Sequence, residues 1–161
     1  MIELFIRWAK LAGSFVAFWI LLWVYNTRGC QRVDGKEMEP TIPAQKTKTI
    51  TPGTGRIEDL ERGDVVSFGT VVGGKGLRSV AARVVGLPGD RVRIDKGEVS
   101  INGTKVGSEF VVQANRTTDD YAEVIVPRDS VFVLCDNRKA GLTIDSRAVG
   151  PVLKWAINGR F

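Results

Sequence analysis

The sequence predicts a mainly β domain preceded by one N-terminal transmembrane helix. An uncharged, strongly apolar run lies near the N-terminus, and short apolar runs with a period of two residues follow it. Gly, Pro, Asn and Asp separate the short runs, as they do between strands. A chain of 161 residues with 43% hydrophobic content is long enough to bury one core. We therefore expect one folded domain after the helix.

The apolar run covers residues 11–27 and contains no charged residue. As a helix it would span roughly 25 Å at about 1.5 Å per residue, near the short limit for crossing a bilayer. A buried core helix and a cleaved signal peptide are the alternatives, but no small-x-small cleavage sequence follows the run. Four aromatic residues suit the two membrane interfaces: Trp8, Trp19, Trp23 and Tyr25. We therefore predict a retained membrane anchor.

The predicted anchor divides the chain into three parts. Residues 1–10 form a stub, residues 11–27 the anchor, and residues 28–161 the β domain. Basic residues flank both ends of the anchor, so the positive-inside rule leaves its orientation open.

The β domain contains six segments with the clearest strand pattern: residues 65–68, 80–85, 92–94, 99–101, 124–126 and 131–134. Asn102 and Gly103 favour the positive φ angles of a tight hairpin turn. Residues 87–90, Leu-Pro-Gly-Asp, favour a type II turn. These signals predict many short strands joined by tight turns.

The composition excludes several classes of site. The chain has no histidine, which excludes a His-based triad and His-ligated zinc. Cys30 and Cys135 are far apart and form no Cys-x-x-Cys motif, so they indicate no metal cluster, although they could pair outside the cytoplasm. The net charge of +5 does not select among anionic lipid, nucleic acid and acidic peptide. We expect no metal and no cofactor.

Four segments follow one another in the β domain: residues 35–42 (Gly-Lys-Glu-Met-Glu-Pro-Thr-Ile), 62–66 (Arg-Gly-Asp-Val-Val), 83–90 (Arg-Val-Val-Gly-Leu-Pro-Gly-Asp), and 136–138 (Asp-Asn-Arg) with 145–147 (Asp-Ser-Arg). Their order and spacing, with the preceding anchor, resemble the type I signal peptidase family, serine endopeptidases of the S26 type. The resemblance covers nearly the whole chain. It implies a signal-peptidase-like β-barrel or β-ribbon domain outside the cytoplasmic membrane, with the stub in the cytoplasm.

The resemblance also implies a Ser nucleophile just before Met38 and a neutral Lys general base just before Arg83. This chain has Glu37 and Ala82 at those positions. A serine hydroxyl attacks a peptide carbonyl only when a base removes its proton, and Lys is a base only when burial lowers its pKa. Loss of one member of such a unit costs on the order of 10⁶ in turnover. We therefore predict no intact catalytic residue at these degenerate dyad positions.

Two alternatives would keep activity. A new chemistry on Glu37 would require acyl transfer to a carboxylate, which forms an anhydride, and no partner base is evident. A displaced Ser or Lys would have to point into the site. If Ala82 faces the site, strand alternation places Val80 and Val84 beside it and turns Ser79 away.

The remaining site residues also come from the resemblance. It implies a substrate groove lined by Gly35, Met38, Pro40, Val80 and Val84. It implies supporting roles for Thr143, Asp145 and Arg147, the last two as an internal salt bridge. Cys135 stands where the family usually has Gly, and the loop from 138 to 145 is longer than in many members. The geometry of this loop is therefore open.

These residues bear on three possible functions. We expect an inactive signal peptidase I-like membrane protein that binds an exported peptide or a partner protein through the former substrate groove, at a sheet edge. The alternative is an active signal peptidase I that removes signal peptides from secreted proteins. A self-cleaving repressor is disfavoured because an anchor stands where a DNA-binding domain would lie and the same dyad is missing. The expected partners are the bilayer and an exported client, not nucleic acid or metal.

Overall fold

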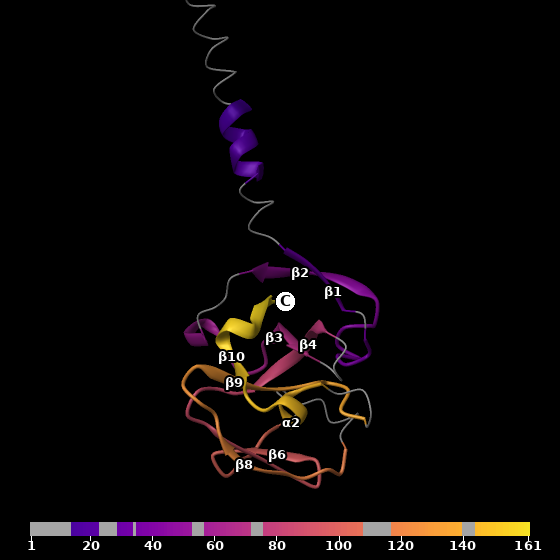
Figure 1. Cartoon of the computed structure of the whole chain (residues 1–161), viewed down its shortest axis with the longest axis vertical. Coiled ribbons are helices and arrows are strands. Elements are labelled where there is room, and N and C mark those ends of the chain that lie inside the picture. Colours follow the sequence, from indigo (N-terminus) through magenta and orange to yellow (C-terminus); the bar gives the residue numbers. More distant parts are fainter. Residues whose placement is uncertain are drawn as a thin grey trace, which may run out of the picture.

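A computed structural model describes residues 14–22, 29–33, 35–52, 57–71, 76–107, 117–139 and 144–161. The large sheet has the strand order β1-β2-β11-β3-β4-β9-β10 and the small sheet the order β7-β6-β5-β8 (Figure 1). The strands of the large sheet are β1 (Gly29–Val33), β2 (Lys46–Pro52), β3 (Val65–Val71), β4 (Leu77–Gly86), β9 (Ser130–Leu134), β10 (Val152–Leu153) and β11 (Ile157–Arg160). Those of the small sheet are β5 (Arg91–Asp95), β6 (Glu98–Ile101), β7 (Thr104–Lys105) and β8 (Tyr121–Ile125).

The prediction of a mainly β fold is confirmed. All strand pairs are antiparallel. The helical segments among the described residues of the domain are one turn each: η1 (Ile57–Asp59), α2 (Ser146–Val149) and η3 (Lys154–Ala156). The outer strands β1 and β10 do not pair with each other, so the described strands of the large sheet remain open and do not form the closed barrel that the resemblance implied.

Residues 14–22 form a helix that lies outside the β domain, beyond β1 and β2 (Figure 1). Its apolar side chains are exposed; Phe15, Trp19 and Leu21, for example, are 65%, 59% and 68% exposed. Within the described part of the chain, no helix has the length and apolar content needed to cross a membrane. Residues 11–13 and 23–27 of the predicted anchor lie outside the described residues, so the anchor stays a prediction.

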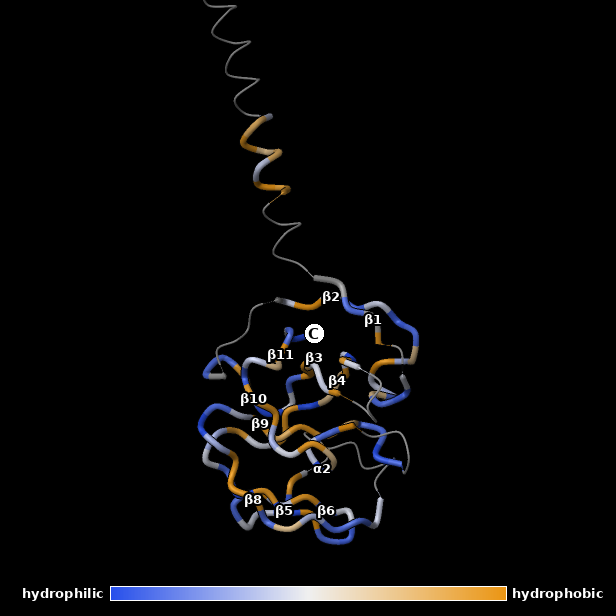
Figure 2. The backbone as a smooth tube through the Cα atoms, viewed as in Figure 1, coloured by the Kyte–Doolittle hydropathy of each residue, from blue (hydrophilic) through white to orange (hydrophobic). Residues whose placement is uncertain are grey.

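Strand β9 lies between two hydrophobic cores, and all five of its residues are buried. Val131 and Val133 pack with β3 and β4 in the core of the large sheet. Phe132 and Leu134 point the other way and pack with β5 and β6. Burial on both faces explains the unbroken apolar run in this strand. Figure 2 shows the resulting hydrophobic stretches along β9 and in the small sheet.

The two predicted turns are present. Asn102 and Gly103 have φ angles of 52° and 82°, the positive values that a tight hairpin requires. The Asp90 amide donates to the Leu87 carbonyl oxygen at 3.0 Å, which closes the turn at residues 87–90, and Gly89 there has a φ of 86°. Both turns therefore form where local residue preferences placed them.

A close contact with the backbone of Thr117 requires a glycine at position 97. Its φ is 75°, and a Cβ atom at this position would lie 1.5 Å from the Thr117 carbonyl oxygen. Its own carbonyl oxygen accepts a hydrogen bond from buried Arg138 at 3.0 Å. The Gly97 backbone therefore cannot move aside easily.

We predict that Gly97→Ala lowers the free energy of unfolding by about 3 kcal/mol or more, because a backbone clash adds to the strain of a positive φ. Gly89→Ala is the matched control: φ is also positive, but a Cβ there meets nothing within 4 Å. That change should cost about 1–2 kcal/mol. Urea denaturation measures both, and equal losses in the two variants would contradict this description of Gly97.

Candidate functional site

The segment after β1 places Glu37 beside β4. The Asn137 amide donates to the Glu37 carbonyl oxygen at 2.8 Å, and the Asn137 side-chain amide donates to the Lys36 carbonyl oxygen at 3.2 Å. Next to Glu37, Met38 is fully buried and packs in a small apolar cluster with Val33, Ile42 and Ala81. Backbone hydrogen bonds and apolar burial together therefore hold the turn that carries Glu37.

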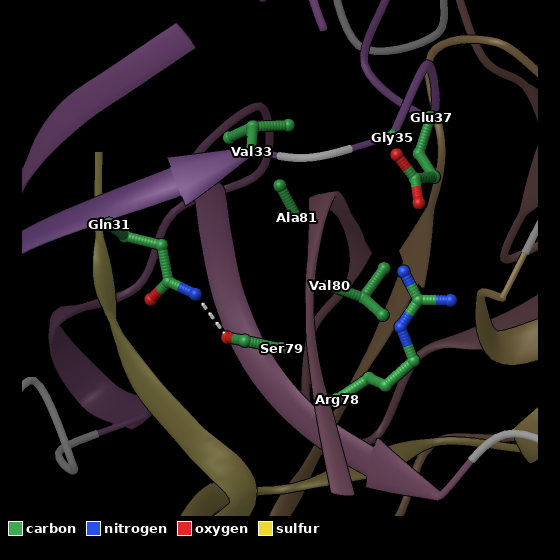
Figure 3. A pocket seen from close by; sticks show the side chains of 8 residues that line it. All are labelled: Gln31, Val33, Gly35, Glu37, Arg78, Ser79, Val80 and Ala81. Carbon is green, nitrogen blue, oxygen red and sulfur yellow. Dashed lines mark hydrogen bonds between the residues drawn. The ribbon is translucent and has the colours of Figure 1, made fainter. Parts of the chain in front are cut away.

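A small pocket lies between β1 and β4. It is lined by Gln31, Val33, Gly35, Glu37, Arg78, Ser79, Val80 and Ala81 (Figure 3). Its volume is about 10 Å³, which is room for about one water-sized group. The side-chain amide of Gln31 donates to the Ser79 hydroxyl across it. The two walls are thus joined by side chains, since β1 and β4 are not neighbours in the sheet.

Gly35 makes room for the Glu37 carboxylate. A Cβ atom on Gly35 would lie 1.9–2.2 Å from the three carboxylate atoms of Glu37. The carboxylate of half-buried Glu37 is therefore folded back over the glycine. Among the described residues, none donates a hydrogen bond to this carboxylate or forms an ion pair with it.

Ala82 lies on the opposite face of β4 from Ala81. It is fully buried in the core of the large sheet, together with Val80 and Val84. The alternation expected for this strand is thus present, and Ala81 packs instead with Val33, Met38 and Ile42. Of the valines, Val80 also lines the pocket, whereas Val84 has no exposed surface. Pro40 is exposed at the turn after Glu37.

Cys135 has a reactive side chain near these positions, and the sequence analysis did not treat it as a site residue. It is a buried free thiol in the same core cluster as Ala82. Burial raises its pKa strongly, and the charges of Asp145 and Glu37 raise it further. The thiol is therefore protonated at neutral pH and is a poor nucleophile.

The Ser79 hydroxyl is fully engaged. It accepts from the side-chain amides of Gln31 and Asn158, the latter at 3.0 Å. The Ser67 hydroxyl lies 2.8 Å away as its third partner. With both acceptor positions filled, Ser79 donates its proton to Ser67, and none of its described partners is a base.

Arg83 fixes the far side of the Glu37 turn. Its guanidinium donates to both carboxylate oxygens of Asp136, at 2.8 and 2.6 Å, and to the Gly63 carbonyl oxygen at 2.7 Å. The Thr41 hydroxyl donates to the same carboxylate at 2.5 Å. Hydrogen bonds from Arg83 to Asp136 raise the pKa of the guanidinium, although burial opposes this. Arg83 therefore stabilises the positions of Asp136 and Gly63 and does not serve as a substitute base.

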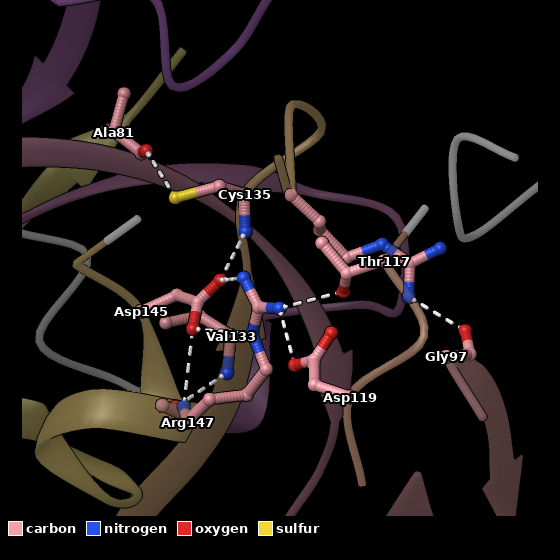
Figure 4. A network of polar contacts seen from close by, with 10 residues as sticks. Ala81, Gly97, Thr117, Asp119, Val133, Cys135, Asp145 and Arg147 are labelled. Atoms are coloured by element: carbon pink, nitrogen blue, oxygen red, sulfur yellow. Dashed lines mark hydrogen bonds and ion pairs between the residues drawn. The ribbon is translucent and has the colours of Figure 1, made fainter. Parts of the chain in front are cut away.

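Asp145 and Arg147 form the ion pair that the resemblance implied. Arg147 Nη2 lies 2.9 Å from Asp145 Oδ2, and Nε donates to Oδ1 at 3.0 Å. Asp145 has no exposed surface, and it also accepts from the Cys135 amide at 3.1 Å. Arg147 also forms an ion pair with Asp119, in which Nη1 lies 2.8 Å from Oδ2 (Figure 4). The third expected supporting residue, Thr143, lies outside the described residues.

Comparison with known proteins identifies the family. The model of the family described as "Signal peptidase, peptidase S26" matches residues 5–161. The chain belongs to this family. It is 37% identical over 124 residues to a signal peptidase I of Bacillus amyloliquefaciens, an alignment that covers 71% of this chain and 63% of that protein. It is 30% identical over 158 residues to a probable signal peptidase I-2 of Synechocystis, covering 95% of this chain and 71% of the relative.

Among solved structures, a signal peptidase I from Enterococcus faecalis matches with a TM-score of 0.49 and 26% identity, covering 64% of this chain and 97% of that one. The chain spans less than two thirds of the length of the Bacillus amyloliquefaciens relative. The match to the family model shows membership of the S26 family, and the activity of this particular member has to be argued from its own residues.

This S26 family member has no described serine–lysine pair at the pocket. The side chains that meet there are a carboxylate, a guanidinium, an amide and an engaged hydroxyl, from Glu37, Arg78, Gln31 and Ser79. Gln31 and Arg78 were missed from the sequence because neither belongs to a quoted motif. Asn137 was within a quoted motif, but its contact with Glu37 spans 100 positions of sequence and had no local signal.

We predict that Asp145→Ala lowers the free energy of unfolding by about 3–5 kcal/mol, because it leaves the Arg147 guanidinium, 12% exposed, without its main partner. The double change Asp145→Leu with Arg147→Met should lose less, because the Asp119 carboxylate, which also loses Arg147, is 41% exposed to water and no buried charge is left uncompensated. The control is Asp129→Ala, which removes the exposed pair with Lys154 and should change stability by at most about 1 kcal/mol. Thermal and urea denaturation measure all three, and a double variant less stable than Asp145→Ala would contradict the explanation.

Proposed function

We propose that this chain is a non-catalytic, signal peptidase I-like membrane protein that binds an exported peptide or a segment of a partner protein. Membership of the S26 family supports the link to exported polypeptides. The residues around Glu37 and Ala82 support the absence of catalysis. The former substrate groove between β1 and β4 is the proposed binding site.

The observation that carries the proposal is the environment of Ala82. Its methyl group lies in a closed apolar cluster with neighbours such as Val66, Val133 and Cys135. The alanine side chain itself has no group that can accept a proton. A lysine base acts only when a buried amine stands next to the nucleophile, so the position supplies no proton acceptor.

Glu37 opposes acyl transfer in a second way. Its carboxylate is at the position of the family's nucleophile, and a negative charge there repels the oxyanion that develops in peptide hydrolysis. Cys135 and Ser79 do not replace the nucleophile, because one is a protonated buried thiol and the other has all its hydrogen bonds engaged.

Binding requires only a strand edge and a pocket. β1 pairs with β2 along one side and is an outer strand, so its second edge has backbone groups for an added strand. The pocket itself has room for about one water-sized group, so a bound segment lies along the surface and inserts only a small group. Separation of Gln31 from Ser79 would widen the groove.

The membrane location is part of this proposal. The exposed apolar helix at residues 14–22 supports an anchor over residues 11–27, with the stub in the cytoplasm and residues 28–161 outside the membrane. In that orientation, the groove meets polypeptides that have crossed the membrane. The client is therefore an exported chain.

An active signal peptidase I is the second candidate, because relatives of 37% and 30% identity carry that name. If the chain is an active signal peptidase I, it should cleave a preprotein without any substitution. The proposed function predicts cleavage only after the dyad has been rebuilt.

We predict that Glu37→Ser combined with Ala82→Lys produces measurable cleavage of a preprotein after a small-x-small sequence. The Ala82 site is fully buried, so a lysine there would have the lowered pKa that a general base needs. Each single variant is the control and should remain inactive, because the two groups act as a unit. A correctly folded double variant without any cleavage, measured by mass spectrometry, would contradict the claim that only the dyad has been lost.

Binding is tested with the full chain in detergent and a fluorescent peptide that spans the cleavage region of a preprotein. Ser79→Trp should weaken binding about tenfold or more, because the indole would fill the pocket between the two walls. Ile125→Trp, on exposed β8 of the small sheet, is the matched control and should bind like the unchanged chain. Equal affinity of the two variants in fluorescence anisotropy would exclude this groove as the site.

A further inference from the structure

The first two strands of the large sheet carry an unbalanced positive charge. β1 and β2 contain three basic residues, Arg32, Lys46 and Lys48, and no acidic residue. Residues 46–49, Lys-Thr-Lys-Thr, are all exposed. β11 pairs only with the last two residues of β2, so among the described residues no strand covers the second edge of this part of β2. Residues 46–49 are named here the basic segment of β2.

The small sheet, at the other end of the domain, balances its charges (Figure 1). Its strands contain three basic and three acidic residues, and they form three ion pairs. These pairs are Arg91 with Glu123 at 3.9 Å, Arg93 with Asp95 at 3.9 Å, and Lys105 with Glu98 at 2.6 Å. No described residue forms an ion pair with Lys46 or Lys48. The described part of the protein therefore leaves the positive charge of the basic segment without a counter-charge.

The chain connection brings this end of the domain close to the predicted anchor. β1 begins at Gly29, two positions after the anchor at residues 11–27. Lys48 lies opposite Gln31 in the antiparallel register, and four extended residues from the end of the anchor to Gln31 span at most about 14 Å. Figure 1 shows β1 and β2 at the end of the domain nearest the helix at residues 14–22. With the proposed anchor in the membrane, the basic segment lies within reach of the lipid headgroups.

The side chains of the basic segment can all donate hydrogen bonds. Each lysine ammonium has three N–H donors and no acceptor, and each threonine hydroxyl adds one donor. Lys46 and Lys48 lie on the same face of β2, roughly 7 Å apart along the strand. Phosphate oxygens accept such hydrogen bonds, and lysines are attracted to the negative potential of anionic lipids. The basic segment therefore suits a surface of anionic phosphate groups.

We propose that the basic segment of β2 binds the headgroups of anionic phospholipids. The inference rests on the membrane location in the proposed function and adds a second contact with the same bilayer. Lipid is favoured over an acidic client because the anchor holds the lipid beside the segment at a high effective concentration, whereas a client arrives by diffusion. The contact uses β2, so the outer edge of β1 remains open to a client.

The test measures which lipid the full chain retains from detergent micelles that contain equal amounts of phosphatidylglycerol and phosphatidylcholine. Mass spectrometry of the purified chain should show more phosphatidylglycerol than phosphatidylcholine. Lys46→Gln with Lys48→Gln should lower the ratio of the two lipids about fivefold or more, because each lysine near an anionic surface contributes roughly a fivefold preference. Lys46→Arg with Lys48→Arg keeps both charges and should keep the ratio.

The matched control is Arg91→Gln with Lys105→Gln, which removes two exposed cations from the small sheet. It should leave the lipid ratio unchanged. A ratio that survives the loss of both lysines of the basic segment, or that falls equally in the control, overturns the inference. An unchanged ratio together with lysine-dependent binding of an acidic peptide would assign the segment to a client instead.

Flotation with phosphatidylcholine vesicles tests the membrane location separately. A full chain that does not float with the vesicles overturns the membrane location and the inference with it. A chain that floats but retains the two lipids equally overturns the inference alone. Circular dichroism checks that each variant is folded. A second measurement needs no variant: about 1 M salt should remove the preference of the unchanged chain, and a preference that persists contradicts a charge-based contact.

Discussion

The burial of β9 on both faces is the constraint on which the rest of this structure depends. Its alternate residues enter two different cores, so the strand has no freedom to shift along or rotate without exposing apolar side chains to water. The segment that follows it, residues 135–138, is consequently held in one place. From there Asp136 binds Arg83 and Asn137 binds the backbone of Glu37.

Two consequences for function follow from this arrangement. The turn that carries Glu37 is held by hydrogen bonds from the segment after the buried strand β9. The geometry of this turn therefore does not depend on catalytic residues. The β4 face that carries Ala82 is packed against β9 and closed, so a change from a polar residue to alanine there adds apolar contact instead of leaving an empty space. A scaffold of this kind tolerates the loss of catalytic groups, because its stability comes from other residues.

Local signals in the sequence were sufficient to predict part of the fold and part of the site. Residue preferences predicted the turns at 87–90 and 102–103, and the alternation of Val80, Ala82 and Val84 followed from strand geometry. The ion pair of Asp145 and Arg147 came from the family resemblance and is present. These features depend on neighbours in sequence or on a motif with fixed spacing.

The parts that could not be predicted depend on pairs far apart in sequence. Gln31 contacts Ser79 because β1 lies near β4, and Asn137 contacts Glu37 because the turn after β1 lies beside the segment that follows β9. Sequence periodicity predicts on which face of a strand a side chain lies, but it does not predict which distant residue packs against that face. The same limit explains why the opposite charges of Glu37 and Arg78 at one pocket were not expected, although each residue was visible in the sequence.

The central claim is that this S26 family member has kept the scaffold and lost the chemistry. The most direct measurement incubates the detergent-solubilised, unchanged chain with a preprotein and follows the mass of the products over time. The account predicts that the preprotein stays intact while an active signal peptidase I under the same conditions cleaves it. Cleavage after a small-x-small sequence by the unchanged chain, persisting in a Glu37→Ala variant, would contradict the account.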